Sequence, residues 1–237
     1  MKRWVLPTAL GLVAAVAVLG GLYQLARSRT AQVFGRLVPR VETERRMVAL
    51  TFDDGPAPEA IDEVLQVLQS RGVPGTFFVN GTNLQRWPEL GRRLVAAGHE
   101  LGNHTYSHER MVLRSQEFIR SEVERTDALI RAAGQVGDIH FRPPFGWKLV
   151  GLPWYLWRTD RTTLTWDVDA DRPPVGRDSS RIASECVRAV RPGSIVLLHV
   201  WYRSRGPSRA ALPVIIDQLH AKGYEMVTVR ELLRLRT

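Results

Sequence analysis

Met47-Val48-Ala49-Leu50-Thr51-Phe52-Asp53-Asp54-Gly55-Pro56 begins as an almost uninterrupted apolar run and ends in two adjacent acids and a turn. The apolar run predicts a strand that is buried on both faces, which is typical of a parallel sheet covered by helices. The Gly-Pro pair predicts that the strand ends there. Successive side chains diverge, so one acid could bind a ligand while its neighbour stays free, although adjacent acids also occur in ordinary turns.

Short apolar runs and amphipathic stretches alternate from this segment to the end of the chain. We expect strands at residues 47–52, 75–79, 100–102, 139–141, 163–166, 194–198 and 225–229, and helices at 60–69, 90–97, 115–133, 179–190 and 209–221. Strand–helix alternation implies parallel strands joined by right-handed crossovers. About seven such units predict an α/β fold, a distorted (β/α) barrel that is closed or nearly closed.

The net charge of +9 at first suggests a nucleic-acid partner. Its distribution argues against one. Residues 1–46 carry eight Lys and Arg against two Glu, so six of the nine net charges precede Met47. We therefore expect no nucleic-acid partner, and we expect a monomer.

Residues 5–26 carry no charged side chain and are rich in Ala, Val, Leu and Gly. About 20 apolar residues can cross a bilayer as a helix, and Gln24-Leu25-Ala26 is a poor signal-peptidase site. We expect a transmembrane signal anchor at 1–26, a basic linker at 27–46 and a folded domain at 47–237. A cleaved, secreted form is the alternative.

The distribution of charge does not decide on which side of the membrane the domain following this anchor lies. The arginines that follow the span outnumber Lys2 and Arg3, which by the positive-inside rule would place the domain in the cytoplasm. Large domains, however, translocate largely regardless of charge. We expect the N-terminus inside the cytoplasm and the domain outside it.

Ionisable side chains follow five of the predicted strands. They are Asp53 and Asp54, His104 and His108, Arg142, Asp167 and Asp169, and His199. In a barrel of parallel strands such positions converge on the C-terminal face, where active sites lie. We therefore expect them to form one site.

The spacing of His104 and His108 suits a metal site. On a helix, four residues bring two imidazoles onto one face. Together with Asp54 they would supply three ligands to Zn²⁺ or a similar ion and leave a position for water. Each residue also has an ordinary interpretation, because His pairs decorate surfaces, Arg142 could form a salt bridge at the rim, and His199 could be a structural hydrogen-bonding group.

Taken together, the motifs resemble the signatures of the polysaccharide deacetylases, the NodB-homology domains of carbohydrate esterase family 4. Residues 51–56 are similar to the first signature, His104-Thr105-x-x-His108 to the second, Arg142-Pro143-Pro144-Phe145-Gly146 to the third and Leu197-x-His199 to the fifth. The resemblance covers residues 46–233. It implies a hydrolase that removes N-acetyl groups from amino-sugar polymers or oligomers such as peptidoglycan, chitin-like chains or exopolysaccharide.

The resemblance also implies the role of each site residue. One divalent ion, Zn²⁺ or alternatively Co²⁺, Mn²⁺ or Ni²⁺, would be bound by Asp54, His104 and His108. Asp53 would be the general base, held charged and oriented by Arg142, and His199 the general acid. The backbone N–H of Phe145 would help to hold the oxyanion, and Leu197 would line the pocket for the acetyl methyl group.

The fourth signature differs from the family pattern, which has an Asp-Trp pair that tunes the catalytic histidine. Arg172-Pro173 stands at the expected place, and Val200 follows His199 where an acid is common. Asp169 and Asp171 are the two candidates to replace the missing acid.

Two other functions stay open because of this difference. One is an amidase of the same fold that acts on a small non-sugar amide, and the other is a glycan-binding protein without turnover. The aromatic-rich segment 147–157 could supply a sugar-stacking surface or pack against the helical shell.

Overall fold

The computed structural model describes residues 5–236, with side chains from residue 11 onward. Its helices are α1 (Val5–Arg27), α2 (Ile61–Ser70), α3 (Gly81–Arg86), α4 (Pro88–Ala96), α5 (Gln116–Ala132), α6 (Gly151–Arg158), α7 (Ser179–Ala189), α8 (Gly206–Ala221) and α9 (Val229–Leu233). Its strands are β1 (Leu37–Val38), β2 (Met47–Gly55), β3 (Thr76–Val79), β4 (Glu100–Asn103), β5 (Thr163–Leu164), β6 (Val168–Asp169), β7 (Ile195–Leu198) and β8 (Glu225–Met226).

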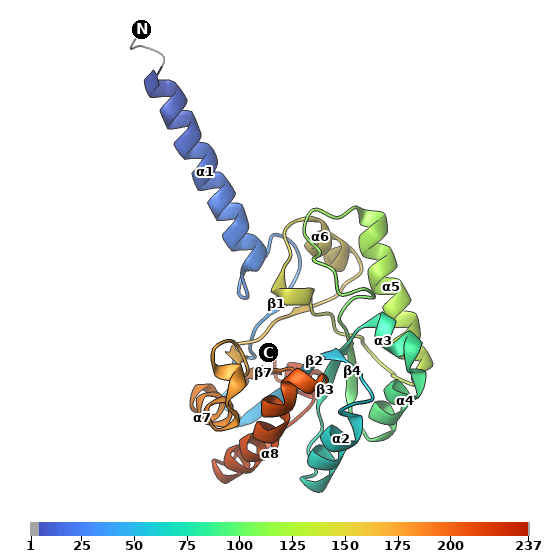
Figure 1. Cartoon of the computed structure of the whole chain (residues 1–237). Helices are drawn as coiled ribbons and strands as arrows, with labels where there is room; N and C mark the ends of the chain where they lie inside the picture. Colours follow the sequence, from blue (N-terminus) through green and yellow to red (C-terminus); the bar gives the residue numbers. More distant parts are fainter. Residues whose placement is uncertain (1–4, 237) are drawn as a thin grey trace.

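Parallel strands form the centre of the domain, and helices surround them (Figure 1). One sheet has the order β4-β3-β2-β7-β6, with β8 also paired to β2, and β1 pairs with β5 in a second sheet. Single parallel bridges from Phe141 to Asn103 and to Thr163 connect β4 to β5. The predicted α/β fold with parallel strands is confirmed.

The two faces of β2 pack differently. Val48, Leu50 and Phe52 belong to the large apolar cluster that includes residues of α2, α7 and α8, and the ring of Phe52 stacks on that of Phe77 at 4.7 Å. Ala49 packs in a second cluster with residues of β3, β5 and β7. Because side chains alternate along a strand, Asp53 falls on the same side as Ala49, at the carboxyl end.

Three predicted strands are at least two residues shorter than expected, and the one at 163–166 is reduced to Thr163–Leu164. The strand at 139–141 is reduced to the bridges of Phe141, and the two prolines that follow lack the N–H groups needed to continue a ladder. The strand at 225–229 ends at Met226, because Thr228 caps α9 through a reciprocal capping box with Glu231. The structure also adds helices α3, α6 and α9 and the short strands β1 and β6, which were not predicted.

Helix α1 projects away from the domain (Figure 1). Among the described residues we find no helix with the length and apolar character that crossing a bilayer requires. The expected transmembrane helix is therefore not supported, and residues 1–4 of the predicted anchor lie outside the described part.

The segment expected to be a linker, residues 27–46, packs against the domain. Within it β1 pairs with β5, and Val38 and Val41 are buried. The ring of Phe34 packs against those of Trp154 and Trp157, with distances of 5.1 and 6.0 Å between the ring centroids. Part of the aromatic-rich segment thus packs against the N-terminal chain.

Candidate functional site

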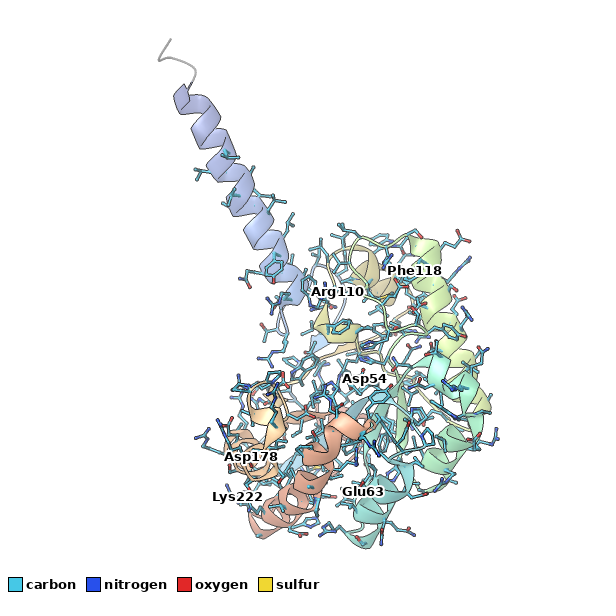
Figure 2. All side chains as sticks on the ribbon, viewed as in Figure 1. Asp54, Glu63, Arg110, Phe118, Asp178 and Lys222 are labelled. Atoms are coloured by element: carbon cyan, nitrogen blue, oxygen red, sulfur yellow. The ribbon has the colours of Figure 1, made fainter. Side chains whose placement is uncertain are left out.

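The carboxyl ends of β2 and β4 bring three potential metal ligands together. One ligand atom from each of Asp54, His104 and His108 lies within 4.8 Å of the other two. Asp54 Oδ1 is 3.5 Å from His104 Nε2 and 2.9 Å from His108 Nε2. Figure 2 shows Asp54 near the middle of the molecule, where the strands end.

The two histidines do not lie on a helix, which corrects the expectation from their spacing. Residues 104–108 form a loop in which Thr105 and His108 have φ values of 67° and 59°. Asp54 and Phe145 also have positive φ values, 71° and 58°. Non-glycine residues rarely adopt this conformation, and such strain collects at functional sites. The turn that joins the imidazoles is therefore a loop held by tertiary contacts.

One hydrogen bond fixes the tautomer of the His104 ring. His104 Nδ1 donates to the backbone oxygen of Arg142 at 2.8 Å, so in the neutral ring Nε2 carries the lone pair that a metal ligand needs. Asp54 Oδ1 is buried and accepts no hydrogen bond from the described residues. An unpartnered carboxylate oxygen beside an imidazole lone pair fits a bound divalent cation.

The backbone of Asp54 is also anchored. Tyr202 Oη and Asn83 Nδ2 each donate to its backbone oxygen at 3.1 Å. Burial by itself would raise the pKa of Asp54, but the imidazoles of His104 and His108 lower it well below the usual range. Asp54 is therefore ionised, as a metal ligand must be.

Asp53 is held by a buried arginine. Arg142 is fully buried, and its Nη1 lies 2.7 Å from Asp53 Oδ1 and donates to Thr51 Oγ1 at 2.8 Å. Its Nη2 donates to the backbone oxygen of Thr165 at 3.0 Å. The other carboxylate oxygen, Asp53 Oδ2, lies 3.6 Å from His104 Nε2. One oxygen of Asp53 is thus fixed while the other faces the ligand cluster.

His199 lies across the site and is paired with Asp171. Its Nε2 is 3.8 Å from Asp54 Oδ2, and its Nδ1 is 3.0 Å from Asp171 Oδ1. Asp171 Oδ2 accepts from the backbone N–H of His199 at 2.8 Å and from Ser208 Oγ at 2.7 Å. Burial would lower the pKa of His199, but the hydrogen bond and charge of Asp171, with the charges of Asp53 and Asp54, raise it to about 9.

This pair corrects the interpretation of the fourth signature. The acid that contacts His199 is Asp171, and Asp169 makes no hydrogen bond to that ring. Arg172 directly follows Asp171. The difference from the family pattern is thus the arginine after the acid, and not the loss of the acid itself.

The site opens into a cavity of about 300 Å³. Leu197 and Phe145, both singled out from the sequence, line it. The Phe145 ring lies 4.7 Å from that of His108 and is about half exposed. The cavity therefore has apolar side chains beside the polar cluster and can admit a small acyl group.

Several residues that hold the site were not predicted. Thr51, Thr165 and Ser208 position Arg142 and Asp171, and Asn83 and Tyr202 hold the backbone of Asp54. Their residue types are common at surfaces and strand ends. No local signal in the sequence marks them.

The site combines three parts on a parallel α/β domain: an Asp-His-His cluster, a buried Asp–Arg pair and a His–Asp pair. This combination is typical of a hydrolase with a metal site. The polysaccharide deacetylase profile matches residues 40–151. A chitooligosaccharide deacetylase of Bradyrhizobium sp. (strain ANU 289) is 37% identical over 196 residues, which cover 76% of this chain and 88% of that protein. The chain belongs to the polysaccharide deacetylase family.

Further relatives agree in sequence and in fold. A peptidoglycan-N-acetylglucosamine deacetylase of Bacillus cereus is 31% identical over 213 residues, which cover 85% of this chain and 95% of that protein. The solved structure of the Bc1960 peptidoglycan N-acetylglucosamine deacetylase superposes with a TM-score of 0.76 at 31% identity, over 81% of this chain and 90% of that one.

Proposed function

We propose that this protein removes acetyl groups from N-acetylated amino-sugar oligomers or polymers. The observation that carries the proposal is the placement of Asp53 and His199 on either side of the Asp54, His104 and His108 cluster. Relatives named as chitooligosaccharide and peptidoglycan deacetylases support this substrate class.

Asp53 and His199, which lie beside the cluster, each carry out one of the two proton transfers. A divalent ion held by Asp54, His104 and His108 would polarise the amide carbonyl and acidify water. Asp53, with one oxygen fixed by Arg142, removes the proton of the water that adds to the carbonyl carbon. His199, charged at neutral pH, donates a proton from Nε2 to the nitrogen as the C–N bond breaks, and acetate and a free amine leave.

The structure favours this function over its two rivals. In a glycan-binding protein without turnover, His199 would need no proton to donate. Here the carboxylate of Asp171 at Nδ1 helps to raise the pKa of His199 to about 9, which keeps Nε2 protonated at neutral pH. A small-amide amidase needs an enclosed pocket. Here Phe145, Trp166, Asp169 and Arg172 line both this cavity and a neighbouring one of about 510 Å³, a groove suited to a longer chain.

We propose an extracytoplasmic location, because the cell-wall and extracellular glycans of this substrate class are found there. Protease added to intact cells should then degrade the domain. Protection until the cells are lysed would place it in the cytoplasm.

The test of function is acetate release from N-acetylglucosamine oligomers by the metal-loaded protein. Asp53→Asn keeps the shape of the side chain but removes the proton acceptor, so the rate should fall about 10²–10⁴-fold while bound metal is retained. Asp160→Asn is the matched control, because that side chain is 97% exposed. Equal rates for Asp53→Asn and wild type would refute the mechanism.

A further inference from the structure

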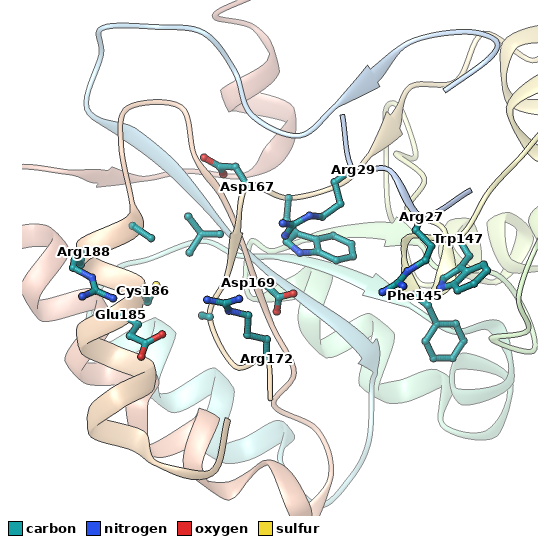
Figure 3. A pocket seen from close by; sticks show the side chains of 14 residues that line it. Arg27, Arg29, Phe145, Trp147, Asp167, Asp169, Arg172, Glu185, Cys186 and Arg188 are labelled. Atoms are coloured by element: carbon teal, nitrogen blue, oxygen red, sulfur yellow. The ribbon is translucent and has the colours of Figure 1, made fainter. Parts of the chain in front are cut away.

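Beside the site lies a second, larger cavity with an excess of arginines. It has a volume of about 510 Å³ (Figure 3). Four residues line both this cavity and the site cavity: Phe145, Trp166, Asp169 and Arg172. Its position is next to the place where the acetamide must bind. Whatever occupies it would be attached to the reacting sugar or would adjoin it.

Four arginines line this cleft, and none forms an ion pair with an acid among residues 11–236. Arg27 and Arg29 come from the chain before β1, Arg172 follows β6, and Arg188 belongs to α7. Figure 3 shows Arg27 and Arg29 on the side of Trp147 and Phe145, and Arg172 nearer to Asp169.

The acidic side chains of the cleft are largely occupied. Asp167 accepts from Ser194 Oγ and from the backbone N–H of Ile195 at 2.8 and 2.9 Å. Glu185 pairs with Arg181 at 3.4 Å. Asp169 remains, and burial together with the charge of Asp171 raises its pKa. The cleft therefore presents more positive than negative charge to a ligand.

The N-terminal arginines are held at the cleft by backbone hydrogen bonds. The backbone N–H of Lys148 donates to the oxygen of Ala26 at 2.9 Å, and Lys148 Nζ donates to the oxygen of Ser28. Thr165 Oγ1 donates to the oxygen of Arg29 at 2.7 Å. Lys148 is buried, and its ammonium group holds the segment that carries Arg27 and Arg29.

The guanidinium groups also rest on aromatic rings. The guanidinium carbon of Arg29 lies 5.8 Å from the Trp166 ring, and that of Arg27 lies 5.7 Å from the Trp147 ring. Arg27 Nη1 donates to Tyr23 Oη at 2.6 Å, whereas the guanidinium of Arg29 makes no hydrogen bond among the described residues and keeps its N–H groups free for a planar anion. The arrangement is thus preorganised for a carboxylate, which arginine binds through two parallel hydrogen bonds.

We propose that this cleft binds a carboxylate on the sugar next to the N-acetylated sugar that reacts, so that the natural substrate is an acidic glycan. The proposal rests on the proposed function. Arg172 lies between the two cavities, at the position after the acid where the family pattern has tryptophan. There its guanidinium contacts the carboxylate from one side, while Arg29 contacts the same carboxylate from the opposite wall.

The test compares two tetrasaccharides that differ only in charge. One alternates N-acetylglucosamine with N-acetylmuramic acid and carries free lactyl carboxylates, and the other has those carboxylates converted to amides. We expect the wild-type full chain to bind the carboxylate form about tenfold more tightly by calorimetry, within the range of a hydrogen bond to a charged group. KM for acetate release should show the same preference.

Arg29→Gln and Arg172→Gln should each lose most of this preference by weakening binding of the carboxylate form alone. Arg120→Gln, an exposed arginine of α5 outside the cleft, should keep it. Equal binding of both tetrasaccharides by the wild type, or equal losses on both in the variants, would overturn the inference. Absence of acetate release from both would overturn the proposed function, while the binding comparison would still decide the inference.

Discussion

Replacement of Asp171 by Asn should move the alkaline limb of the pH–rate profile to lower pH. Asp171 is buried and contacts His199 twice, at Nδ1 and at the backbone N–H. The asparagine keeps the shape but removes the negative charge. A carboxylate at this distance raises the pKa of a neighbouring cation by about 1–3 units, which is on the order of 1–4 kcal/mol.

The alkaline limb moves to lower pH because the protonated form of His199 is the one that acts as the acid. His199 must be protonated to donate to the leaving nitrogen, so the rate falls as pH rises through its pKa. That pKa is raised to about 9 in the native site, and without the charge of Asp171 the fall should begin about 1–3 units lower. At pH 8 a drop of 1–3 units in this pKa reduces the protonated fraction of His199, so we expect a rate loss between about 2-fold and about 100-fold.

The assay is initial acetate release from an N-acetylglucosamine oligomer between pH 5 and 10, with metal content measured in parallel. Ser208→Ala is the control, because it removes one hydrogen bond to Asp171 but no charge. Bound metal should be unchanged in both variants. An alkaline limb in Asp171→Asn that coincides with that of the wild type would refute the role of Asp171 in holding the proton on His199.

Three further predictions concern the metal, the buried ion pair and pH-dependent stability. His104→Ala and His108→Ala should lose most bound metal by elemental analysis, and full occupancy in both would refute the ligand assignment. Arg142→Met leaves the charge of Asp53 buried and unpaired, so urea unfolding should show a loss of about 3–5 kcal/mol; a loss below 1 kcal/mol would contradict this. Because the folded pKa of His199 is raised to about 9, its stabilisation is present below about pH 6.5 and is lost as pH rises to about 9. Metal-free wild type should therefore lose stability over this window relative to His199→Gln, and parallel pH curves would contradict it.

Much of the site was readable from the sequence because its residues directly follow buried strands. The apolar run before Asp53 and Asp54 predicts both the strand and its end, and the same holds for His199 after β7. In a parallel fold such ends converge without any knowledge of distances. The prediction was wrong where it depended on local geometry, as in the helix expected for His104 and His108.

The partner of His199 could not be chosen from the sequence. Asp169 and Asp171 are two residues apart on one short segment and share the same local chemistry. Only the packing of that segment against β7 and α8 brings Asp171 to His199 and to Ser208.

By itself, then, the sequence determined the parallel α/β class and the family, because hydrophobic patterning and motif order are properties of the chain alone, and it supplied the candidate site residues. The tertiary structure decided the loop conformation of the histidine pair, the choice of Asp171 and the docking of Arg27 and Arg29 beside the site. These depend on contacts between residues distant in the chain, which are 28 positions apart for Asp171 with His199, 38 for His104 with Arg142 and 136 for Thr165 with Arg29. Such contacts are set by how the whole core packs, and no local pattern in the chain encodes them.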